Sequence, residues 1–342
     1  MNTNSASKKA ISMVCLIAGI ILLAVSLIQD ISGSGAGWRG PALIIGAIGI
    51  LLGMYLFPTL KHHRSIVNFI FVFPLLFTFV VTVIIPLCLG VFYSFTDWNG
   101  IKMTGFIGFA NYKAMFSEPS FLWSLIITIL FVVLNMVLVN VVAFMLALLC
   151  TSKIKGLSFF RASYFLPNLI GGIVLGYIWQ ILINCVMTIL EQPLLALNAT
   201  AGYWGLIILM GWQQIGYMMI IYIAGLQNVP DSLIEAAEID GANRLQTLFK
   251  IKIPMVMSSV TICIFLTLTN SFKLFDQNLA LTGGDPNHMT DMMALNIYNT
   301  FYARSGMQWK GYGQAKAVIF CALVIFISLF QLRATRSREV QQ

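Results

Sequence analysis

Charged residues are scarce in this 342-residue chain. Asp, Glu, Lys and Arg together make up 9% of it, whereas soluble domains carry about 25%. Hydrophobic residues make up 59%, and the mean hydropathy is +0.88. This composition excludes an ordinary soluble domain and predicts a protein that crosses the membrane several times.

Long polar stretches are also few, because apolar runs occupy most of the chain. Eight of these runs are about the length that a membrane-spanning helix needs, roughly 20 residues. They cover about 12–29, 41–58, 67–91, 122–149, 163–186, 204–226, 256–275 and 313–332. The apolar residues are continuous rather than alternating, which favours helices over a barrel. The predicted fold class is therefore all-α, with about eight transmembrane helices.

Several catalytic signatures are missing. The chain has no GxxxxGK[ST] phosphate loop, no GxSxG and no HExxH. His62 and His63 are adjacent, so they do not share a helix face, and neither has a third histidine or a carboxylate nearby. Solvation at the membrane interface is favoured over metal binding for both, and for the isolated His288. We therefore expect no catalytic residue, metal or cofactor in this chain.

The six cysteines form no CxxC pair. They lie within or beside the apolar runs, at positions 15, 88, 150, 185, 263 and 321. We expect them to be buried, reduced and structural; a disulfide framework or a metal site is the alternative.

The net charge of +8 follows from topology without any need for nucleic acid. With the N-terminus inside, thirteen Lys and Arg fall on the inner side and six or seven on the outer side. Positive charge collects on the cytoplasmic side of membrane proteins, so both termini are predicted to be cytoplasmic. An even number of spans agrees with that orientation.

Two domains are predicted. Residues 1–64 form a hairpin of two spans, in which Gly19, Gly46, Gly49 and Gly53 allow close helix packing. A peripheral hairpin without a transport role is the favoured interpretation. Residues 65–342 hold the other six spans and form the transport domain. Between its fourth and fifth spans lies an unusually polar cytoplasmic segment, 227–256.

This polar segment predicts two helices separated by a glycine. Ser232 and Glu235 have the spacing of a capping box, which predicts the start of the first helix. Gly241 stands where a left-handed residue would end it, and a second short helix follows. Pro254 marks the start of the next span. Physics alone leaves two alternatives open, a docking surface for a soluble partner or a connector lying on lipid headgroups.

The same segment resembles the EAA signature of binding-protein-dependent ABC importer permeases. That pattern is Glu-Ala-Ala, three residues, Gly, nine residues, then Ile-x-Leu-Pro. The matching residues are Glu235, Ala236, Ala237, Gly241, Ile251 and Pro254, with Ile253 in place of Leu. Segments 94–98, 108–112, 160–167, 281–286 and 311–315 resemble the carbohydrate-uptake, maltose-type branch of this family. The resemblance covers roughly 65–342, a six-helix type I importer core, and leaves the hairpin outside.

What the resemblance implies is a permease subunit in a bacterial cytoplasmic membrane. It would pair with a second, homologous permease and with two copies of a cytoplasmic ATPase subunit, which bind ATP and Mg. An extracytoplasmic sugar-binding protein would deliver the sugar or oligosaccharide. The ATPase-coupling residues would be Glu235, Ala236, Ala237, Asp240, Gly241 and Ala242. The remaining partner is membrane lipid, and no nucleic acid is expected.

Polar residues inside spans are candidates for sugar binding, because burying them unpaired is unfavourable. Together with one apolar residue on the same helix face, they are Tyr164, Asn168, Gln213, Gln214, Thr267, Asn270, Ser271 and Leu274. These positions align with places where the maltose-type family lines its substrate site. Interhelical hydrogen bonds that only hold the bundle together are the competing interpretation.

Lys273 and Asp276 lie near the outer end of the fifth core span. A structural pair at i and i+3 is favoured over a site for charged sugar acids. Two other function classes compete with the importer. An ion-coupled secondary transporter would place ionisable groups at mid-membrane, and a membrane-embedded enzyme would cluster His, Asp or Glu there. The span centres hold essentially none of these groups.

Overall fold

The computed structural model describes residues 3–31, 38–56, 63–152, 156–302 and 309–336. These residues form helices, and their only β-type pairing is an isolated bridge between Thr96 and Phe106. The predicted all-α fold class is confirmed. The chain divides into two compact units, 1–89 and 90–342. The functional boundary between 64 and 65 stays a prediction.

Five helices of the described part are long and apolar enough to cross a membrane. They are Phe71–Ser94, Pro119–Cys150, Gly172–Ile189, Ala199–Gln227 and Lys310–Arg336. A sixth span results if Arg244–Met255 and Met257–Phe272, which meet at a bend of 72°, are counted together. The apolar helices Ala10–Ser26 and Gly40–Leu56 of the predicted hairpin are shorter.

The first unit contains α1 (Thr3–Ile31), α2 (Arg39–Leu56), α3 (His63–Phe79), the π-helix η1 (Val80–Ile84) and the start of α4 (Ile85–Ser94). Glycines let α1 and α2 approach closely, as predicted. A Cβ on Gly19 would lie 2.8 Å from the carbonyl oxygen of Gly46, and Ser12 Oγ donates to the carbonyl of Gly53 at 2.5 Å. His62 and the side chain of His63 lie outside the described residues.

Two π-helical turns precede prolines. One is η1, ahead of Pro86, and the other is η4 (Leu248–Lys252), ahead of Pro254. A proline has no N–H to donate and its ring clashes with the carbonyl four residues earlier. In both cases that carbonyl belongs to a residue of the π-turn, where the wider ladder relieves the clash.

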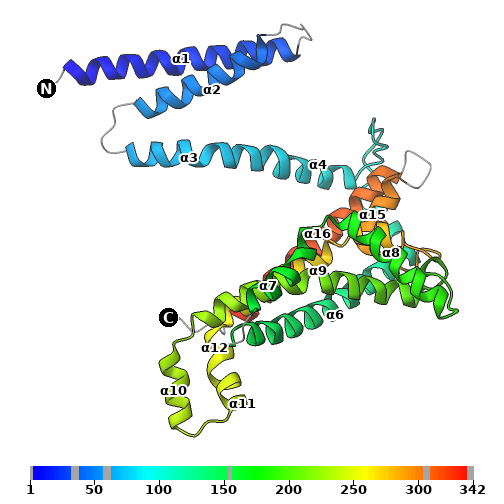
Figure 1. Cartoon of the computed structure of the whole chain (residues 1–342). Coiled ribbons are helices and arrows are strands. Elements are labelled where there is room, and N and C mark those ends of the chain that lie inside the picture. Colours follow the sequence, from blue (N-terminus) through cyan, green and yellow to red (C-terminus); the bar gives the residue numbers. More distant parts are fainter. Residues whose placement is uncertain (1–2, 32–37, 57–62, 153–155, 303–308, 337–342) are drawn as a thin grey trace. The chain divides into compact units, whose positions relative to one another are not determined.

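The second unit is built around α6 (Pro119–Cys150) and α9 (Ala199–Gln227) (Figure 1). Against them pack α7 (Leu157–Phe165), α8 (Gly172–Ile189) and α13 (Met257–Phe272), and α16 (Trp309–Arg336) packs against α13. Of the apolar 18-residue stretch of α9, 67% is buried, whereas only 33% of the corresponding stretch of α6 is buried. Polar residues on α9 are therefore held by protein rather than facing lipid.

The third core span, predicted over 163–186, is not one continuous helix. Helix α7 ends at Phe165, a 3-10 turn η2 (Leu166–Leu169) follows, and α8 begins only at Gly172. Pro167 enters the 3-10 turn, and Ile170 has an extended backbone with ψ of 132°. The predicted start at 163 was wrong because the length of the apolar run was used alone, and that measure does not register the break at Pro167 and the Gly171-Gly172 pair.

Smaller elements gather on the side predicted to be extracytoplasmic. They are α5 (Ala110–Phe116), η3 (Leu195–Leu197), α14 (Asp276–Leu281) and α15 (Met293–Tyr302). Lys316 of α16 is fully buried against them, with its Nζ 2.9 Å from Glu118 Oε2, 2.9 Å from Asn296 Oδ1 and 3.1 Å from Thr300 Oγ1. This buried ion pair ties α15 to α16 and to the start of α6.

The first outer loop is closed by side-chain bonds to the backbone. Asn111 Nδ2 donates to the carbonyls of Ser94 and Thr96, both at 2.9 Å. Asp97 accepts from the hydroxyl of Thr104 and from the backbone N–H groups of Thr104 and Gly105. These bonds, that from the Thr104 hydroxyl first, lower the pKa of Asp97 below its ordinary value.

The expected burial of the cysteines is only partly correct. Cys150 and Cys263 are buried, Cys15 and Cys321 are half-buried, and Cys88 and Cys185 are exposed on the protein surface. Exposure of a cysteine on an apolar helix face places it where lipid would cover it, a position that composition does not distinguish from the protein core.

Candidate functional site

A polar cavity of about 300 Å³ lies where η2, α9, α13 and α14 meet. Its lining consists of Asn168, Met210, Gln213, Gln214, Asn270, Lys273, Phe275, Asp276 and Gln277. The break after Pro167 carries Asn168 to this place, while α9 supplies the two glutamines. Four amide groups predicted from the sequence, those of Asn168, Gln213, Gln214 and Asn270, are thus brought together.

One wall of the cavity is fixed by a chain of hydrogen bonds. Gln277 Nε2 donates to Gln213 Oε1 at 2.7 Å, and Gln213 Nε2 donates to the carbonyl oxygen of Ile170 at 3.3 Å. The chain joins α14, α9 and the extended residue before α8. It also occupies the oxygen and one N–H of the Gln213 amide, which orients that side chain.

The neighbouring Gln214 is different. Its side chain is buried, and neither its amide oxygen nor its amide nitrogen has a hydrogen-bond partner among the described residues. A buried amide left unpaired costs about 1–3 kcal/mol. Gln214 lines the cavity, but its amide atoms are themselves buried, so a solute would reach this unused donor and acceptor only after the side chain turned toward the opening.

Thr267, Ser271 and Leu274 do not line this cavity. Thr267 Oγ1 accepts from Asn140 Nδ2 at 3.3 Å, and Ser271 Oγ accepts from Asn135 Nδ2 at 2.8 Å. Leu274 is buried in an apolar cluster. All three positions hold helices together here, which is the competing interpretation given above. Their role in sugar binding stays a prediction.

Tyr164 also lies apart from the cavity lining. It lies near α9, and its ring packs against the ring of Phe160, with the two ring centroids 4.6 Å apart. Its carbonyl comes so close to Gly216 that a Cβ at residue 216 would overlap it. The main chain of Tyr164 therefore sets the approach of α7 to α9, and its contact with substrate stays a prediction.

Lys273 and Asp276 both line the cavity, and within the described residues they form no salt bridge with each other. The favoured structural pair is therefore not present. Sequence reasoning missed Met210, Phe275 and Gln277. Gln277 lies just beyond the span predicted over 256–275, and only the folding back of α14 carries it to Gln213.

The polar segment forms a second candidate site. It holds α10 (Asp231–Ile239), α11 (Arg244–Thr247), η4 and α12 (Ile253–Met255), which extend from one end of the bundle in Figure 1. Gly241 has φ of +77°, a left-handed conformation. The N–H of Gly241 donates to the carbonyl of Glu238, and that of Ala242 to the carbonyl of Ala237. These two bonds are a Schellman motif, so the predicted helix end is confirmed.

The predicted capping box at Ser232 and Glu235 is absent. Helix α10 starts after Pro230, without a side-chain cap. The box instead opens α11, where Asn243 Oδ1 accepts from the N–H of Gln246 and Gln246 Oε1 accepts from the N–H of Asn243, both at 2.8 Å. The Asn-x-x-Gln spacing directly after Gly241 was the available signal.

The segment carries apolar side chains that the described residues leave exposed. Ile239 is 86% exposed, Leu245 65% and Phe249 64%. Between its two arms lies an open cavity of about 510 Å³, lined by Leu233, Ala236, Ala237, Asp240, Gly241, Ala242, Gln246, Lys250 and Ile251. Five of the six predicted coupling residues line it, and the sixth, Glu235, is exposed on α10. Exposed apolar groups of this size are typical of a protein-binding surface.

Comparison with known families decides the identity. Residues 45–339 match the model of the binding-protein-dependent transport system inner membrane component. The chain belongs to this family. The resemblance given by the polar segment is thereby confirmed, and the chain is a multi-pass transport permease.

Related permeases extend over most of this one. The chain is 43% identical, over 80% of its length and 94% of the relative's, to the "Probable starch degradation products transport system permease protein AmyD" of Thermoanaerobacterium thermosulfurigenes. It is 32% identical, over 75% and 90%, to the "Multiple sugar-binding transport system permease protein MsmF" of Streptococcus mutans. It is also 32% identical, over 71% and 84%, to the "sn-glycerol-3-phosphate transport system permease protein UgpA" of Rhizobium meliloti.

A similar fold occurs in the crystal structure of another transporter. The permease superimposes with a TM-score of 0.69 on a chain of a bacterial ABC transporter involved in the import of the acidic polysaccharide alginate, covering 81% of this chain and 97% of that one. The sequence identity is 17%, so this likeness describes the fold alone.

Proposed function

We propose that this permease moves a sugar or oligosaccharide inward across the cytoplasmic membrane of a bacterium, driven by ATP hydrolysis in a partner subunit. The observation that carries the proposal is the polar segment 227–256. It combines a family signature, a helix end fixed by Gly241 and exposed apolar groups on one projecting element. Such a surface suits a cleft on a soluble partner better than a lipid surface, because its two arms enclose a cavity.

A carbohydrate substrate is supported by relatives and by the outer cavity. The most similar relatives named above are assigned to starch degradation products and to multiple sugars. The cavity offers amides for hydroxyl groups, and Met210 and Phe275 for the apolar face of a sugar ring. Lys273 and Asp276 add charges at its rim, so a substituted or acidic sugar would also find a partner there.

The remaining partners are proposed from the family. A second permease completes the pore, two ATPase subunits bind ATP and Mg, and an extracytoplasmic protein delivers the sugar. The helix α10 inserts into one ATPase subunit. Basic residues near the predicted cytoplasmic ends, among them Lys250, Lys252, Arg333 and Arg336, favour cytoplasmic termini.

The test is sugar uptake into proteoliposomes that contain the complete complex and internal ATP. We expect uptake to require the catalytic residue of the ATPase subunit. Glu235→Lys and Gly241→Trp should keep the permease in the membrane while uptake falls and hydrolysis continues. Normal transport by both variants would contradict the coupling role.

The same vesicles test the ion-coupled alternative. Uptake driven by a proton or sodium gradient, with the permease alone and no ATP, would favour a secondary transporter. An ion-coupled mechanism needs buried ionisable groups, and Lys316 with Glu118 is such a pair. The two groups are bound to each other at the outer ends of α16 and α6, however, and do not form a path through the bundle.

A further inference from the structure

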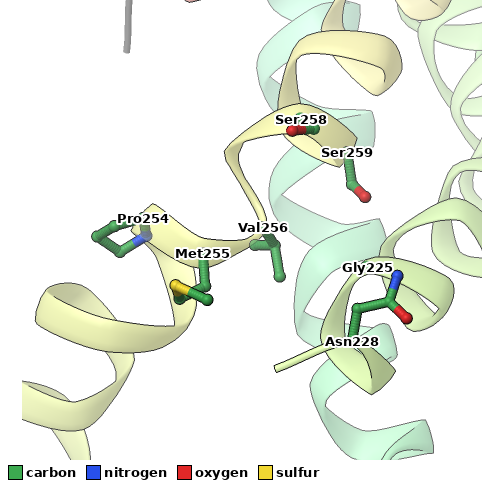
Figure 2. A pocket seen from close by; sticks show the side chains of 7 residues that line it. All are labelled: Gly225, Asn228, Pro254, Met255, Val256, Ser258 and Ser259. Carbon is green, nitrogen blue, oxygen red and sulfur yellow. The ribbon is translucent and has the colours of Figure 1, made fainter. Parts of the chain in front are cut away.

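Both arms of the polar segment join the bundle at one place. Helix α9 ends at Gln227, and the chain returns to the bundle at Met255 and Val256. A cavity of about 200 Å³ lies there, lined by Gly225, Asn228, Pro254, Met255, Val256, Ser258 and Ser259. Figure 2 shows Pro254 and Met255 on one side of it, and Gly225 with Asn228 on the other, with Val256 between them.

Val256 has the geometry of a hinge. It separates the helices Arg244–Met255 and Met257–Phe272, whose axes differ by 72°. Its backbone leaves the helical region, at φ −97° and ψ 15°, while its N–H still donates to the carbonyl of Lys252 and its carbonyl accepts from Val260. The Val256 side chain is 1% exposed and belongs to the cluster of Tyr222 and Leu226. The bend is thus anchored in the core rather than free.

The wall opposite this bend is a close contact between α9 and α13. A Cβ added to Gly225 would overlap the hydroxyl of Ser259 and lie 2.9 Å from its Cβ, whereas Val256 Cβ would be at an ordinary 3.6 Å. The distance between α9 and α13 is therefore compatible with a serine at 259 only if residue 225 is glycine. A larger residue at 225 requires glycine at 259. A substitution at one position has a defined compensating change at the other.

Helix α13 connects the hinge with the outer cavity. It has 16 residues, or about 24 Å at 1.5 Å per residue. Asn270, near the far end of α13, lines the outer cavity together with Gln214. Lys273, the first residue after α13, lines the same cavity. Interiors are closely packed and transmit displacements, so a rotation at the base of a rigid helix moves its other end.

We propose that Val256 is the hinge through which the polar segment moves α13, and that the Gly225–Ser259 contact holds the fixed side of this hinge. The cavity leaves room for Pro254 and Met255 as the segment rotates. Gly225 and Ser259 are positioning residues, because they line neither the outer cavity nor the cavity between the arms of the polar segment. The inference rests on the proposed coupling function of α10.

The decisive experiment compares single and double variants in the complete reconstituted complex, measuring uptake, ATP hydrolysis and thermal stability. Gly225→Ala should lower the ratio of uptake to hydrolysis about fivefold or more, as expected when coupling between sites is lost. Ser259→Gly alone should stay within about twofold of wild type, and the double variant should recover the ratio. Gly205→Ala, on the same helix with only the ends of Ile183 and Leu281 nearby, is the matched control and should change nothing.

An unchanged ratio in Gly225→Ala, or a double variant that is no better than Gly225→Ala, would overturn the hinge. If Gly225→Ala does not assemble, Ser258→Trp decides, because residue 258 is exposed and lines the cavity. Filling the cavity should reduce uptake and hydrolysis together, and wild-type values would overturn the proposal. Glu235→Lys distinguishes failure of the hinge proposal from failure of the proposed coupling function. If Glu235→Lys uncouples uptake from hydrolysis while the hinge variants do not, only the hinge proposal is wrong. If Glu235→Lys also behaves as wild type, the proposed coupling function is wrong.

Discussion

At the residue scale, polar side chains of neighbouring positions serve different purposes. Asn270 lines the outer cavity, whereas Ser271, the next residue, bonds to Asn135 of α6. Gln213 is held by two hydrogen bonds, whereas the adjacent Gln214 has none among the described residues. Buried polar groups are normally hydrogen-bonded, so the paired Gln213 and Ser271 have a structural explanation, whereas the unpaired amide of Gln214 needs another one. We propose that this explanation is contact with the solute.

Gln214→Leu should therefore lower uptake and raise stability. Removing the unpaired amide relieves about 1–3 kcal/mol of desolvation cost, while the solute loses one or two hydrogen bonds. We expect maximal uptake to fall about fivefold or more and the melting temperature of the complex to rise. Thr269→Val is the control, since its hydroxyl bonds to its own helix. Unchanged uptake would show that the solute does not meet Gln214.

Ser271→Ala should have the opposite pattern. It removes the acceptor of Asn135 Nδ2 in the core, at a cost of about 1–3 kcal/mol in stability. We expect a lower melting temperature with unchanged uptake per assembled complex. Reduced uptake at full stability would instead support the sequence-based assignment of Ser271 to the sugar site.

At the scale of elements, prolines and glycines explain most of what sequence predicts well. Gly241 was placed correctly, because only glycine adopts this left-handed helix end without strain, and the helices on either side follow from it. The break at Pro167 and the ion pair of Lys316 were missed. The ion pair depends on which distant elements pack against α16, and hydrophobic periodicity contains no information on that. The break has local signals, Pro167 and the two glycines before α8, which the length of an apolar run does not register.

The same limit explains the mixed outcome for the solute cavity. Periodicity correctly grouped Thr267 and Ser271 on one face of α13, but it does not state that this face meets α6 rather than the cavity. Leu274 was placed on the same face wrongly, because α13 ends at Phe272 and Leu274 follows it in the apolar core. Asn168 lines the cavity because the chain breaks before α8, and Asn270 lines it because it lies near the end of α13. Gln277 was missed because α14 folds back on α8, a tertiary feature.

Gly241→Ala should weaken the polar segment in a measurable way. Alanine in the left-handed region costs about 1–2 kcal/mol, although a Cβ there would meet no neighbour. We expect faster amide exchange in α10 and reduced uptake, with Gly241→Asn milder. Gly156→Ala is a matched control, with φ of +89° and equally open space at the start of α7. Its stability should fall similarly while coupling is kept. Equal loss of uptake in both would point to general instability.

At the scale of the whole molecule, the permease has two candidate sites that lie far apart, the outer cavity and the polar segment. The outer cavity and the polar segment lie at opposite ends of α13, and α9 runs beside it from one end to the other. Binding of a solute and closure of an ATPase can influence each other only if the helices between them have two arrangements. The bend at Val256 is the element that supplies a second arrangement.

The most direct test of this account is a cross-link from the polar segment to its partner. Ala236→Cys, at an exposed position of α10, should react with a cysteine-directed cross-linker and join the permease to the ATPase subunit in the native complex. The controls are the parent protein, which has the exposed Cys88 and Cys185, and an Ile208→Cys variant at an exposed position of α9. A permease–ATPase product should form with Ala236→Cys alone. Labelling of that cysteine only from the extracytoplasmic side, or cross-linking only to lipid, would contradict it.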